Sequence, residues 1–381
     1  MGFMKTTLSF LHLADLHIGA RFAFLPPELA QLRRQHIKDA FAESVRIAIG
    51  KRSESERVEV FLISGDLFDS ANPSLVDIAF VQQQLRILQR NNVSTFLISG
   101  NHDWYEKGNF WDNEDFPVTR HFTSYDFDIY EDPQLDLTVV GIAFNRKRTS
   151  VNHLAQFDYE PQTSRSILLY HGAWQNPSIT FTRDYPFKLE DVEKLRINYV
   201  ALGHYHKMTK LVDEKKTKVC YSGSIEGLDF AVGELGKRFI IRGEIASNGD
   251  VAVVPIEMNK MEMECMDYDC TTFSLNHFLN ELHKSVSPHR LLKVTLTGVP
   301  TVDFLMQMPK IKEELEGQFA YLNFRDETLQ LPKDLPEDEQ TYLGLFARRI
   351  RSSIDQATDP EEKRLLRKAL EYGLAATCKS E

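Results

Sequence analysis

The sequence predicts an α/β fold in which two β-sheets pack against each other. Residues 8–103 run in the order strand, helix, strand, helix, strand, which is typical of a largely parallel sheet with right-handed crossovers. Strand-type segments return after residue 136 in close succession, which indicates a second sheet packed on the first. Several of these strands end in a glycine or a polar side chain, and ligands gather at strand ends in such sheets.

Three strands and two helices make up the first half of the prediction. Residues 8–14 are apolar and alternate like a strand. Residues 58–64 and 94–99 have the composition of buried strands and are followed by Gly65 and Gly100. Apolar side chains recur at helical spacing within the two segments between these strands, residues 33–51 and 75–90.

Residues 104–132 are rich in aromatic and acidic side chains without a clear period, so we expect a long loop or lid there. Its aromatic side chains suit either stacking on unpaired bases or the core of a lid or dimer interface. A helix is predicted over residues 189–196. The strands of the second sheet are predicted over residues 137–142, 166–170, 199–202, 218–222 and 238–244.

Beyond residue 255 the chain carries no metal-ligand motif, and we expect a smaller α+β unit. It combines predicted helices over residues 271–284 and 309–316 with predicted strands over residues 291–297 and 321–325. A proline- and acid-rich joint at residues 332–337 precedes two amphipathic helical stretches. The predicted domains are therefore residues 1–255, 256–335 and 336–381.

Composition and charge limit the classes of protein to which the chain can belong. The 381 residues are 42% hydrophobic and 26% charged, as in ordinary soluble globular proteins. The net charge of −10 lacks the strongly basic field typical of nucleic-acid binders. The four cysteines form no Cys-x-x-Cys pair, which argues against a thiolate zinc site. Neither a membrane span nor a signal peptide is expected, so we predict a cytoplasmic location.

Five short segments at predicted strand ends carry side chains that bind metals. Taken singly, each has an ordinary explanation, because Asp-x-His is common and a lone histidine is more often packed in a core. The coincidence of all five favours a metal site. The candidate ligands are two carboxylates, one amide and four imidazoles: Asp15, Asp66, Asn101, His17, His171, His204 and His206.

This ligand set suits a pair of divalent cations. Alternate residues of an extended segment share a face, which brings together Asp15 with His17 and His204 with His206. Asp66 is the candidate carboxylate to bridge the two ions. Oxygen and nitrogen donors without thiolate favour Mn²⁺, Fe or Zn²⁺. Two such ions about 3.5–4 Å apart hold a phosphate and activate a water for attack on phosphorus.

His102 is the candidate catalytic side chain, because it directly follows the candidate ligand Asn101 and can point at the substrate. A proton for the leaving oxygen is the contribution expected of it. Asp103 is predicted to orient His102 through a hydrogen bond, as carboxylates near metal sites commonly do. Asp69 is a further candidate for such a supporting role.

In this order, the motifs resemble those of the calcineurin-like metallophosphoesterase superfamily. The resemblance narrows to SbcD/Mre-type DNA-repair exonucleases, with bacterial YhaO-like members nearest. It is specific over about residues 8–226 and weaker beyond. Asp69 stands where some relatives carry a histidine, which leaves its role open. The segments that carry the narrower resemblance are residues 10–17, 63–69, 201–207 and 221–224.

The resemblance implies a two-sheet sandwich flanked by helices, with a dinuclear manganese centre. It implies one ion held by Asp15, His17, Asp66 and His206. The other ion would be held by Asp66, Asn101, His171 and His204. Residues from about 256 to 335 would form a capping domain that shapes DNA access. The last two helices would contact the coiled coil of an SbcC-like ABC-type ATPase, and homodimerisation is also implied.

The leading hypothesis is a metal-dependent DNA exonuclease or endonuclease, the nuclease subunit of a DNA-repair complex. Two alternatives stay open. The acidic net charge also suits a phosphodiesterase for nucleotides or other small molecules. The C-terminal helices also suit a protein that mainly scaffolds an SbcC-like ATPase. Basic side chains near the motif loops are candidates for contacts to a DNA backbone: Arg21, Lys107, Arg146, Lys147, Arg148, Arg183 and Lys207.

Overall fold

The computed structural model describes residues 6–145, 150–175, 184–328 and 342–378. The chain forms two compact units, Met1–Lys260 and Met261–Glu381. The predicted joint at residues 332–337 and four of the predicted basic contacts, Arg146, Lys147, Arg148 and Arg183, lie outside the described residues. Among the described helices, each is too short or too polar to cross a membrane.

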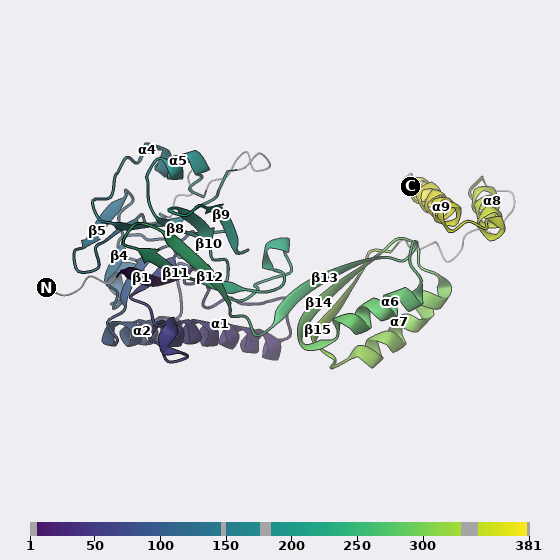
Figure 1. Ribbon diagram of the computed structural model, residues 1–381. Coiled ribbons are helices and arrows are strands. Elements are labelled where there is room, and N and C mark those ends of the chain that lie inside the picture. The colour runs from purple at the N-terminus through teal and green to yellow at the C-terminus, as the bar shows by residue number, and fades with distance from the viewer. Residues whose placement is uncertain (1–5, 146–149, 176–183, 329–341, 379–381) are drawn as a thin grey trace. The chain divides into compact units, whose positions relative to one another are not determined.

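The first sheet of the larger unit has six strands, of which the four at one side are parallel. Helices α1 (Pro27–Ala48) and α2 (Leu75–Arg90) cover its outer face (Figure 1). At the other side, β11 pairs antiparallel with β1, and β12 pairs antiparallel with β11 at the edge of the sheet. The order across the sheet is β12 (Val251–Glu257), β11 (Phe239–Ala246), β1 (Thr7–Leu13), β2 (Val60–Ser64), β3 (Ser94–Ile98) and β4 (Arg120–Phe122).

The second sheet also has six strands, with a parallel centre and an antiparallel strand at each edge. Short helices α4 (His153–Gln156) and α5 (Leu189–Glu193) lie on its outer side, so the unit is layered helix, sheet, sheet, helix (Figure 1). Its order is β5 (Asp128–Asp132), β6 (Leu137–Gly141), β7 (Arg165–His171), β8 (Tyr199–Gly203), β10 (Lys218–Tyr221) and β9 (Thr209–Asp213).

The main core lies between these sheets because alternate side chains of both point inward. Fully buried members from the first sheet include Phe10, Leu62 and Phe96, and those from the second include Ile167 and Tyr199. A second core fills the space between the second sheet and its helices. The two-sheet α/β fold predicted from the sequence is confirmed.

Several local predictions differ from the structure. Residues 238–244 belong to β11, which pairs with β1 in the first sheet instead of joining the second. The predicted loop over residues 104–132 contains α3 (Phe110–Asn113) and the short strands β4 and β5. Helix α1 begins at Pro27, six residues before the predicted start at residue 33, because proline is well tolerated in the first helical turn.

The smaller unit contains a three-stranded parallel sheet of β13 (Glu262–Asp269), β14 (Ser287–Thr297) and β15 (Phe319–Asp326). Helices α6 (Leu275–Ser285) and α7 (Val302–Leu315) pack on it around a shared core (Figure 1). Strand β13 was not predicted, because its alternation of acidic and apolar residues is broken at Cys265 and Met266. Helices α8 (Tyr342–Gln356) and α9 (Pro360–Cys378) cover the predicted amphipathic stretches and pack on each other.

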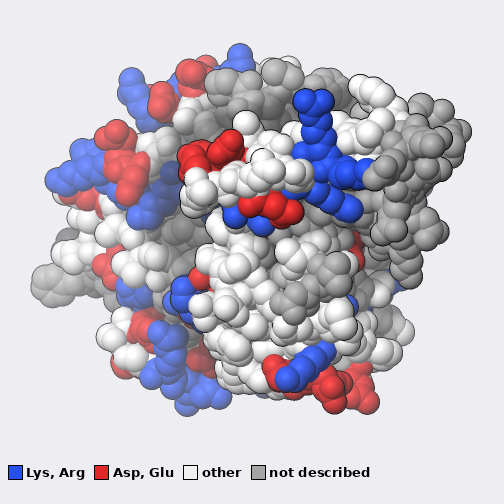
Figure 2. All heavy atoms as spheres, turned by 90° about the vertical axis from the view of Figure 1, so that its right-hand side faces the viewer, with Lys and Arg blue, Asp and Glu red and all other residues white. Residues whose placement is uncertain are grey.

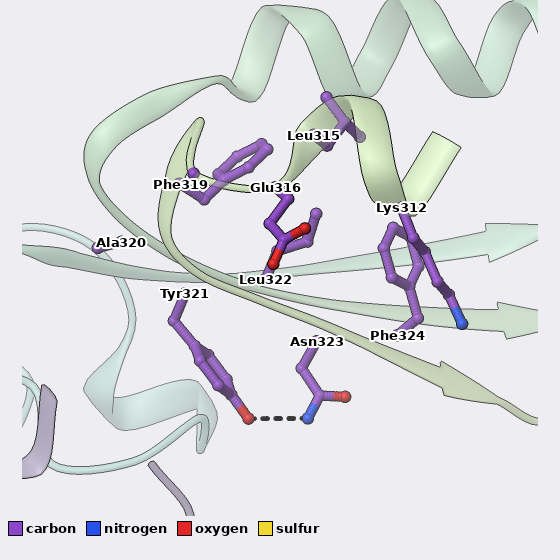
Figure 3. Close-up of a pocket in the computed structure, with 10 residues that line it drawn as sticks. Lys312, Leu315, Glu316, Phe319, Ala320, Tyr321, Leu322, Asn323 and Phe324 are labelled. Atoms are coloured by element: carbon purple, nitrogen blue, oxygen red, sulfur yellow. Dashed lines mark hydrogen bonds between the residues drawn. The ribbon is translucent and has the colours of Figure 1, made fainter. Parts of the chain in front are cut away.

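A cavity of about 440 Å³ lies between the end of α7 and the edge strand β15. Figure 3 shows Tyr321 and Asn323 side by side at its wall, where their side chains are hydrogen-bonded at 2.9 Å. Lys312 and Glu316 give the cavity one charge of each sign. The described residues that line it include none of the predicted metal ligands, which agrees with the absence of ligand motifs in this part of the sequence.

A buried ion pair ties α1 to the loop after β10. Arg33 and Glu226 are fully buried, with Arg33 Nη1 2.7 Å from Glu226 Oε2 and Arg33 Nη2 2.6 Å from the carbonyl of Gly227. Arg33→Ala leaves Glu226 without its cationic partner in the interior, which typically costs about 3–5 kcal/mol. We expect a clearly lower thermal unfolding midpoint for this variant, with little change for Arg46→Ala, which replaces an exposed arginine of the same helix. Equal midpoints for the two variants would contradict the prediction.

Candidate metal centre

The predicted metal ligands all lie at carboxyl ends of parallel strands. Strands β1, β2 and β3 of the first sheet and β7 and β8 of the second end at the same place, where contacts between side chains join the two sheets. Asp15 and His17 follow β1, Asp66 follows β2, Asn101 follows β3, His171 ends β7, and His204 and His206 follow β8.

One cluster joins Asp15, His17 and His206. Their ligand atoms lie within 4.8 Å of one another, and His17 Nε2 is 3.3 Å from His206 Nε2. Asp15 and His17 are buried. The backbone amide of His204 donates to both oxygens of the Asp15 carboxylate, at 3.0 and 3.2 Å, which fixes the orientation of that carboxylate.

A second cluster surrounds Asn101. Its Oδ1 atom lies 2.9 Å from His171 Nε2 and 3.0 Å from His204 Nδ1. Asp66 stands between the two clusters, with Oδ2 3.4 Å from His171 Nε2 and 3.6 Å from His17 Nε2. This is the place that a bridging carboxylate must occupy. The structure therefore brings all seven predicted ligands into one contiguous group.

The hydrogen bonds of the imidazoles leave their ligand atoms free in the first cluster. His17 Nδ1 is 3.1 Å from Asp69 Oδ1, and His206 Nδ1 faces Glu234 Oε1. Each Nδ1–H therefore donates to a carboxylate, and the lone pairs of the two Nε2 atoms face each other. Two acceptors 3.3 Å apart repel each other unless a cation or a proton lies between them.

In the second cluster, too, the hydrogen bonds of an imidazole leave one ring nitrogen available as a ligand atom. His171 Nδ1 donates to the carbonyl of Ser64 at 2.9 Å, so Nε2, which faces the amide oxygen of Asn101, is the ring nitrogen left to bind a cation. The donor set of carboxylate, amide and imidazole groups is one that Mn²⁺, Fe and Zn²⁺ accept. Both clusters thus fit a divalent cation by their geometry and by their chemistry.

Backbone strain is concentrated at these residues. Asp15, His17 and Asp66 have φ values of +52°, +49° and +48°, and His204 has +108°. Positive φ is uncommon for residues with a Cβ and costs free energy, so the surrounding structure must hold these residues in place. The strain aims side chains of neighbouring strands at a common centre.

Glycine is required where the strand ends approach most closely. A Cβ at Gly100 would collide with the carboxylate and the backbone amide of Asp66, and a Cβ at Gly65 would collide with the ring of His171. The glycines that the sequence places after β2 and β3 therefore permit the close approach of the ligand segments, as well as ending the strands.

Comparison with known proteins agrees with this geometry. The family model for the calcineurin-like phosphoesterases matches residues 8–208, more than half of the chain. This chain belongs to the calcineurin-like phosphoesterase family. The family resemblance predicted from the strand-end motifs is thereby confirmed. The phosphoesterase carries its candidate metal clusters inside the matched region.

Several named relatives of the phosphoesterase align over most of its length. It is 29% identical to the uncharacterized metallophosphoesterase YhaO of Bacillus subtilis, over 94% of this chain and 91% of YhaO. It is 26% identical to the DNA double-strand break repair protein Mre11 of Saccharolobus solfataricus, over 86% of each chain. Mre11 of Methanocaldococcus jannaschii is 23% identical over 68% of each chain.

The charges of the buried ligands balance one another. Burial alone would raise the pKa of Asp66, but His171, His17 and His102 hold that pKa well below its usual range. Burial alone would lower the pKa of His171, but Asp66 and Asp15 raise it to about 9. These shifts favour an ionised Asp66 carboxylate beside a protonated His171 imidazole near neutral pH, and a divalent cation can take the place of the His171 proton.

The pKa of His206 is raised, as is that of His171. Burial alone would lower its pKa, but the hydrogen bond to Glu234 and the charge of Asp15 raise the pKa to about 9. His204 differs, because burial and the charge of His171 lower its pKa to about 3 and keep it neutral. A cation that enters the site must therefore displace protons from His171 and His206.

This displacement predicts that metal affinity rises with pH. Below pH 9, binding of the metal releases up to two protons, so we expect the Mn²⁺ affinity to increase roughly 10- to 100-fold per pH unit. Calorimetric titrations with Mn²⁺ at several pH values between 6 and 8 measure this slope. Repeating them in buffers of different ionisation enthalpy counts the protons released. A pH-independent affinity would contradict the prediction.

His102 lies at the exposed rim of the clusters. Its ring is 4.6 Å from the His17 ring, and its Nδ1 atom is 3.3 Å from the carbonyl of Asp69. His102, His17 and Asp69 also form a third group with metal-binding side chains. The backbone amide of His102 donates to Asp66 Oδ1 at 2.8 Å, which connects the rim to the predicted bridge.

Asp103 has partners other than the expected one. It was predicted to orient His102, but its carboxylate accepts from the amides of Gly100 at 2.7 Å and Phe68 at 3.1 Å. Burial and the charge of Asp66 raise the pKa of Asp103 to about 7. Among the described contacts, the atom that holds His102 Nδ1 is the carbonyl oxygen of Asp69. Asp103 thus stabilises the loop after β3.

Aromatic packing fixes the same loop. Trp111 is buried against Phe68 and Phe116, and its indole Nε1 donates to the carbonyl of Asp103. The sequence left open whether this ring stacks on bases or packs in a lid, and the structure places it inside the larger unit. Its position supports the segment that carries Asn101 and His102.

Glu234 was not predicted from the sequence; it is buried and contacts His206 from 28 residues further along the chain. The residue stands in a short turn, Val232–Glu234, with neither a ligand motif nor a regular spacing to mark it. Because Glu234 and His206 are far apart in the sequence, no local sequence pattern predicts their contact.

Proposed function

We propose that this phosphoesterase is a metal-dependent DNA nuclease. The observation that carries the proposal is the convergence of seven candidate oxygen and nitrogen ligands in two adjacent clusters with a histidine at their rim. The similarity to an archaeal Mre11 over 86% of each chain supports DNA as the substrate class. The cleavage assay described below distinguishes an exonuclease from an endonuclease activity.

The ligands divide between two ions. We assign Asp15, His17 and His206 to one ion, Asn101, His171 and His204 to the other, and Asp66 to both. When bound, two Mn²⁺ ions, or Fe or Zn²⁺ in their place, would neutralise phosphate charge and make a water molecule more acidic. The chain itself supplies the strained strand ends that hold these seven side chains in place.

His102 is the proposed proton donor to the leaving oxygen. Its Nδ1–H faces the carbonyl of Asp69 at 3.3 Å, which turns Nε2 away from that carbonyl. The exposed ring lets a substrate approach Nε2, and a protonated imidazole there can give its proton to the oxygen that leaves phosphorus. Asp69 acts on His102 through its backbone and on His17 through its side chain.

The remaining parts of the chain have proposed roles outside the chemistry. We assign the region after β12 to a cap that shapes access of DNA, and α8 and α9 to contacts with the coiled coil of an SbcC-like ABC-type ATPase. Homodimer formation and a cytoplasmic location stay predictions. Exposed Arg21, Lys107 and Lys207 are the described basic side chains that we propose for phosphate contacts.

A small-molecule phosphodiesterase is the second candidate, and the charge distribution favours it. The chain carries a net charge of −10, and basic and acidic side chains are interspersed on the face shown in Figure 2. A protein that grips DNA through backbone contacts usually gathers Lys and Arg on one surface.

One experiment separates these candidates. The purified protein is loaded with Mn²⁺, its metal content is measured, and end-labelled duplex and hairpin DNA are offered beside a cyclic dinucleotide and bis-p-nitrophenyl phosphate. Cleavage of DNA by wild type and not by His102→Ala supports the nuclease. Turnover of the small diesters with intact DNA supports the second candidate. Retention of Mn²⁺ without hydrolysis of any of these substrates would exclude both.

A further inference from the structure

Glu234 makes a set of contacts that sets it apart from other acidic residues near the metal ligands. Its side chain is 6% exposed, and Oε1 accepts a hydrogen bond from His206 Nδ1. Its Oε2 accepts from Ser224 Oγ at 3.0 Å and from the amide of Leu228 at 3.1 Å. With both oxygens engaged, the carboxylate has one orientation in which every contact is satisfied.

Arg238 holds the segment that carries Glu234 against the segment that carries His206. The guanidinium is buried, and its Nη1 donates to the carbonyls of His206 at 2.7 Å and Gly233 at 2.8 Å. Its Nη2 donates to the carbonyl of Leu235 at 2.7 Å. These bonds fix the distance between the two backbones, so the imidazole of His206 and the carboxylate of Glu234 meet without freedom to drift apart.

The hydrogen bond between His206 and Glu234 determines which ring nitrogen of His206 is available to bind a cation. With Nδ1–H directed at Glu234, the lone pair lies on Nε2, and Nε2 is 3.3 Å from Nε2 of His17 in the first cluster. A carboxylate on the distal N–H also makes an imidazole a better electron donor to a metal. His17 has a similar partner in Asp69, but the Asp69 side chain is 34% exposed and water can replace it.

We propose that Glu234 is a positioning residue of the metal centre, which fixes the tautomer and direction of His206 for the cation shared with Asp15 and His17. The inference rests on the proposed function, because it requires that cations occupy the clusters. Its effect is confined to one of the two sites, since His204, His171 and Asn101 of the other site have different partners.

The test compares Glu234→Gln with Glu234→Ala, Ser224→Ala and Asp229→Ala. Glutamine keeps an acceptor oxygen of the same reach and removes the charge, while alanine removes both. Ser224→Ala removes a loop contact of the same carboxylate and spares His206. Asp229 is exposed in the same loop and contacts the amide of Ala231, so its variant is the matched control.

Mn²⁺ affinity of each site is measured by calorimetry, and spin-coupled Mn²⁺ pairs are followed by electron paramagnetic resonance. We expect about 10-fold weaker binding at one site for Glu234→Gln and 10- to 100-fold for Glu234→Ala, with the other site retained. Ser224→Ala and Asp229→Ala should stay within about twofold of wild type. Nitrogen-15 spectra of the histidine rings in the diamagnetic Zn²⁺-loaded protein should show the proton on Nδ1 of His206 in wild type and a mixture of Nδ1–H and Nε2–H forms in Glu234→Ala.

The outcomes separate this inference from the proposed function. If wild type binds two Mn²⁺ and Glu234→Gln and Glu234→Ala bind both as tightly, Glu234 is not a positioning residue and the metal centre stands. If Ser224→Ala weakens binding as much as Glu234→Ala, the role of Glu234 is to support the loop, and the inference fails. If wild type binds no Mn²⁺ pair, the proposed function itself fails. Thermal unfolding checks that each variant is folded.

Discussion

Replacement of Asp66 by alanine is expected to remove the metal pair and to reduce phosphodiester cleavage by at least about 10³-fold. Asp66 is 1% exposed and stands between the two clusters, 3.4 Å from His171 Nε2 and 3.6 Å from His17 Nε2. A carboxylate at this position can bind both of the proposed cations. Loss of Lewis-acid stabilisation removes several kcal/mol from the transition state, and each 1.36 kcal/mol is about tenfold in rate.

Two measurements check this expectation. Elemental analysis of the Mn²⁺-loaded protein should fall from about two ions per chain to less than one, and single-turnover cleavage should fall with it. Asp66→Asn keeps the shape and removes the charge, so it should lose metal as well. Asp213→Asn, on the exposed edge strand β9, is the matched control and should retain both ions. If Asp66→Ala keeps both ions, Asp66 is not a ligand of the metal centre.

The strand ends of this protein were predictable because strand-ending glycines and metal-binding side chains lie next to each other in the sequence. Gly65 and Gly100 end the predicted strands, and the candidate ligands Asp66 and Asn101 follow directly. Close packing explains why glycine is needed, since a Cβ at Gly100 would meet the Asp66 carboxylate. Helix α2 matched its predicted range because Ser74 caps its first turn and apolar residues follow at helical spacing.

What the sequence did not predict depends on contacts between distant residues. The pairing of β11 with β1 joins segments more than 200 residues apart, and local alternation cannot say which sheet a strand enters. Glu234 reaches His206 through a turn without a motif. The expected hydrogen bond from the His102 ring to the Asp103 carboxylate rested on adjacency in sequence, but that carboxylate accepts from the amides of Gly100 and Phe68.

Replacement of His102 by alanine is expected to keep both metal ions and to slow DNA cleavage by roughly 10²–10⁴-fold, the range for loss of a general acid. The ring is exposed at the rim of the clusters and is held by the carbonyl of Asp69, while the seven candidate ligands contact one another without it. His283→Ala, an exposed histidine of α6, is the matched control and should leave metal content and rate unchanged.

The leaving group distinguishes proton donation from a role of His102 in metal binding. A p-nitrophenolate leaves without a proton, so His102→Ala should slow a p-nitrophenyl phosphodiester by roughly tenfold or less while DNA cleavage shows the full loss. An equal loss on both substrates, with Mn²⁺ retained, would assign His102 to substrate positioning. Loss of one Mn²⁺ ion would instead make it a ligand, in line with its grouping with His17 and Asp69. Because the three roles predict three different results, this pair of substrates decides how the histidine at the rim takes part in cleavage.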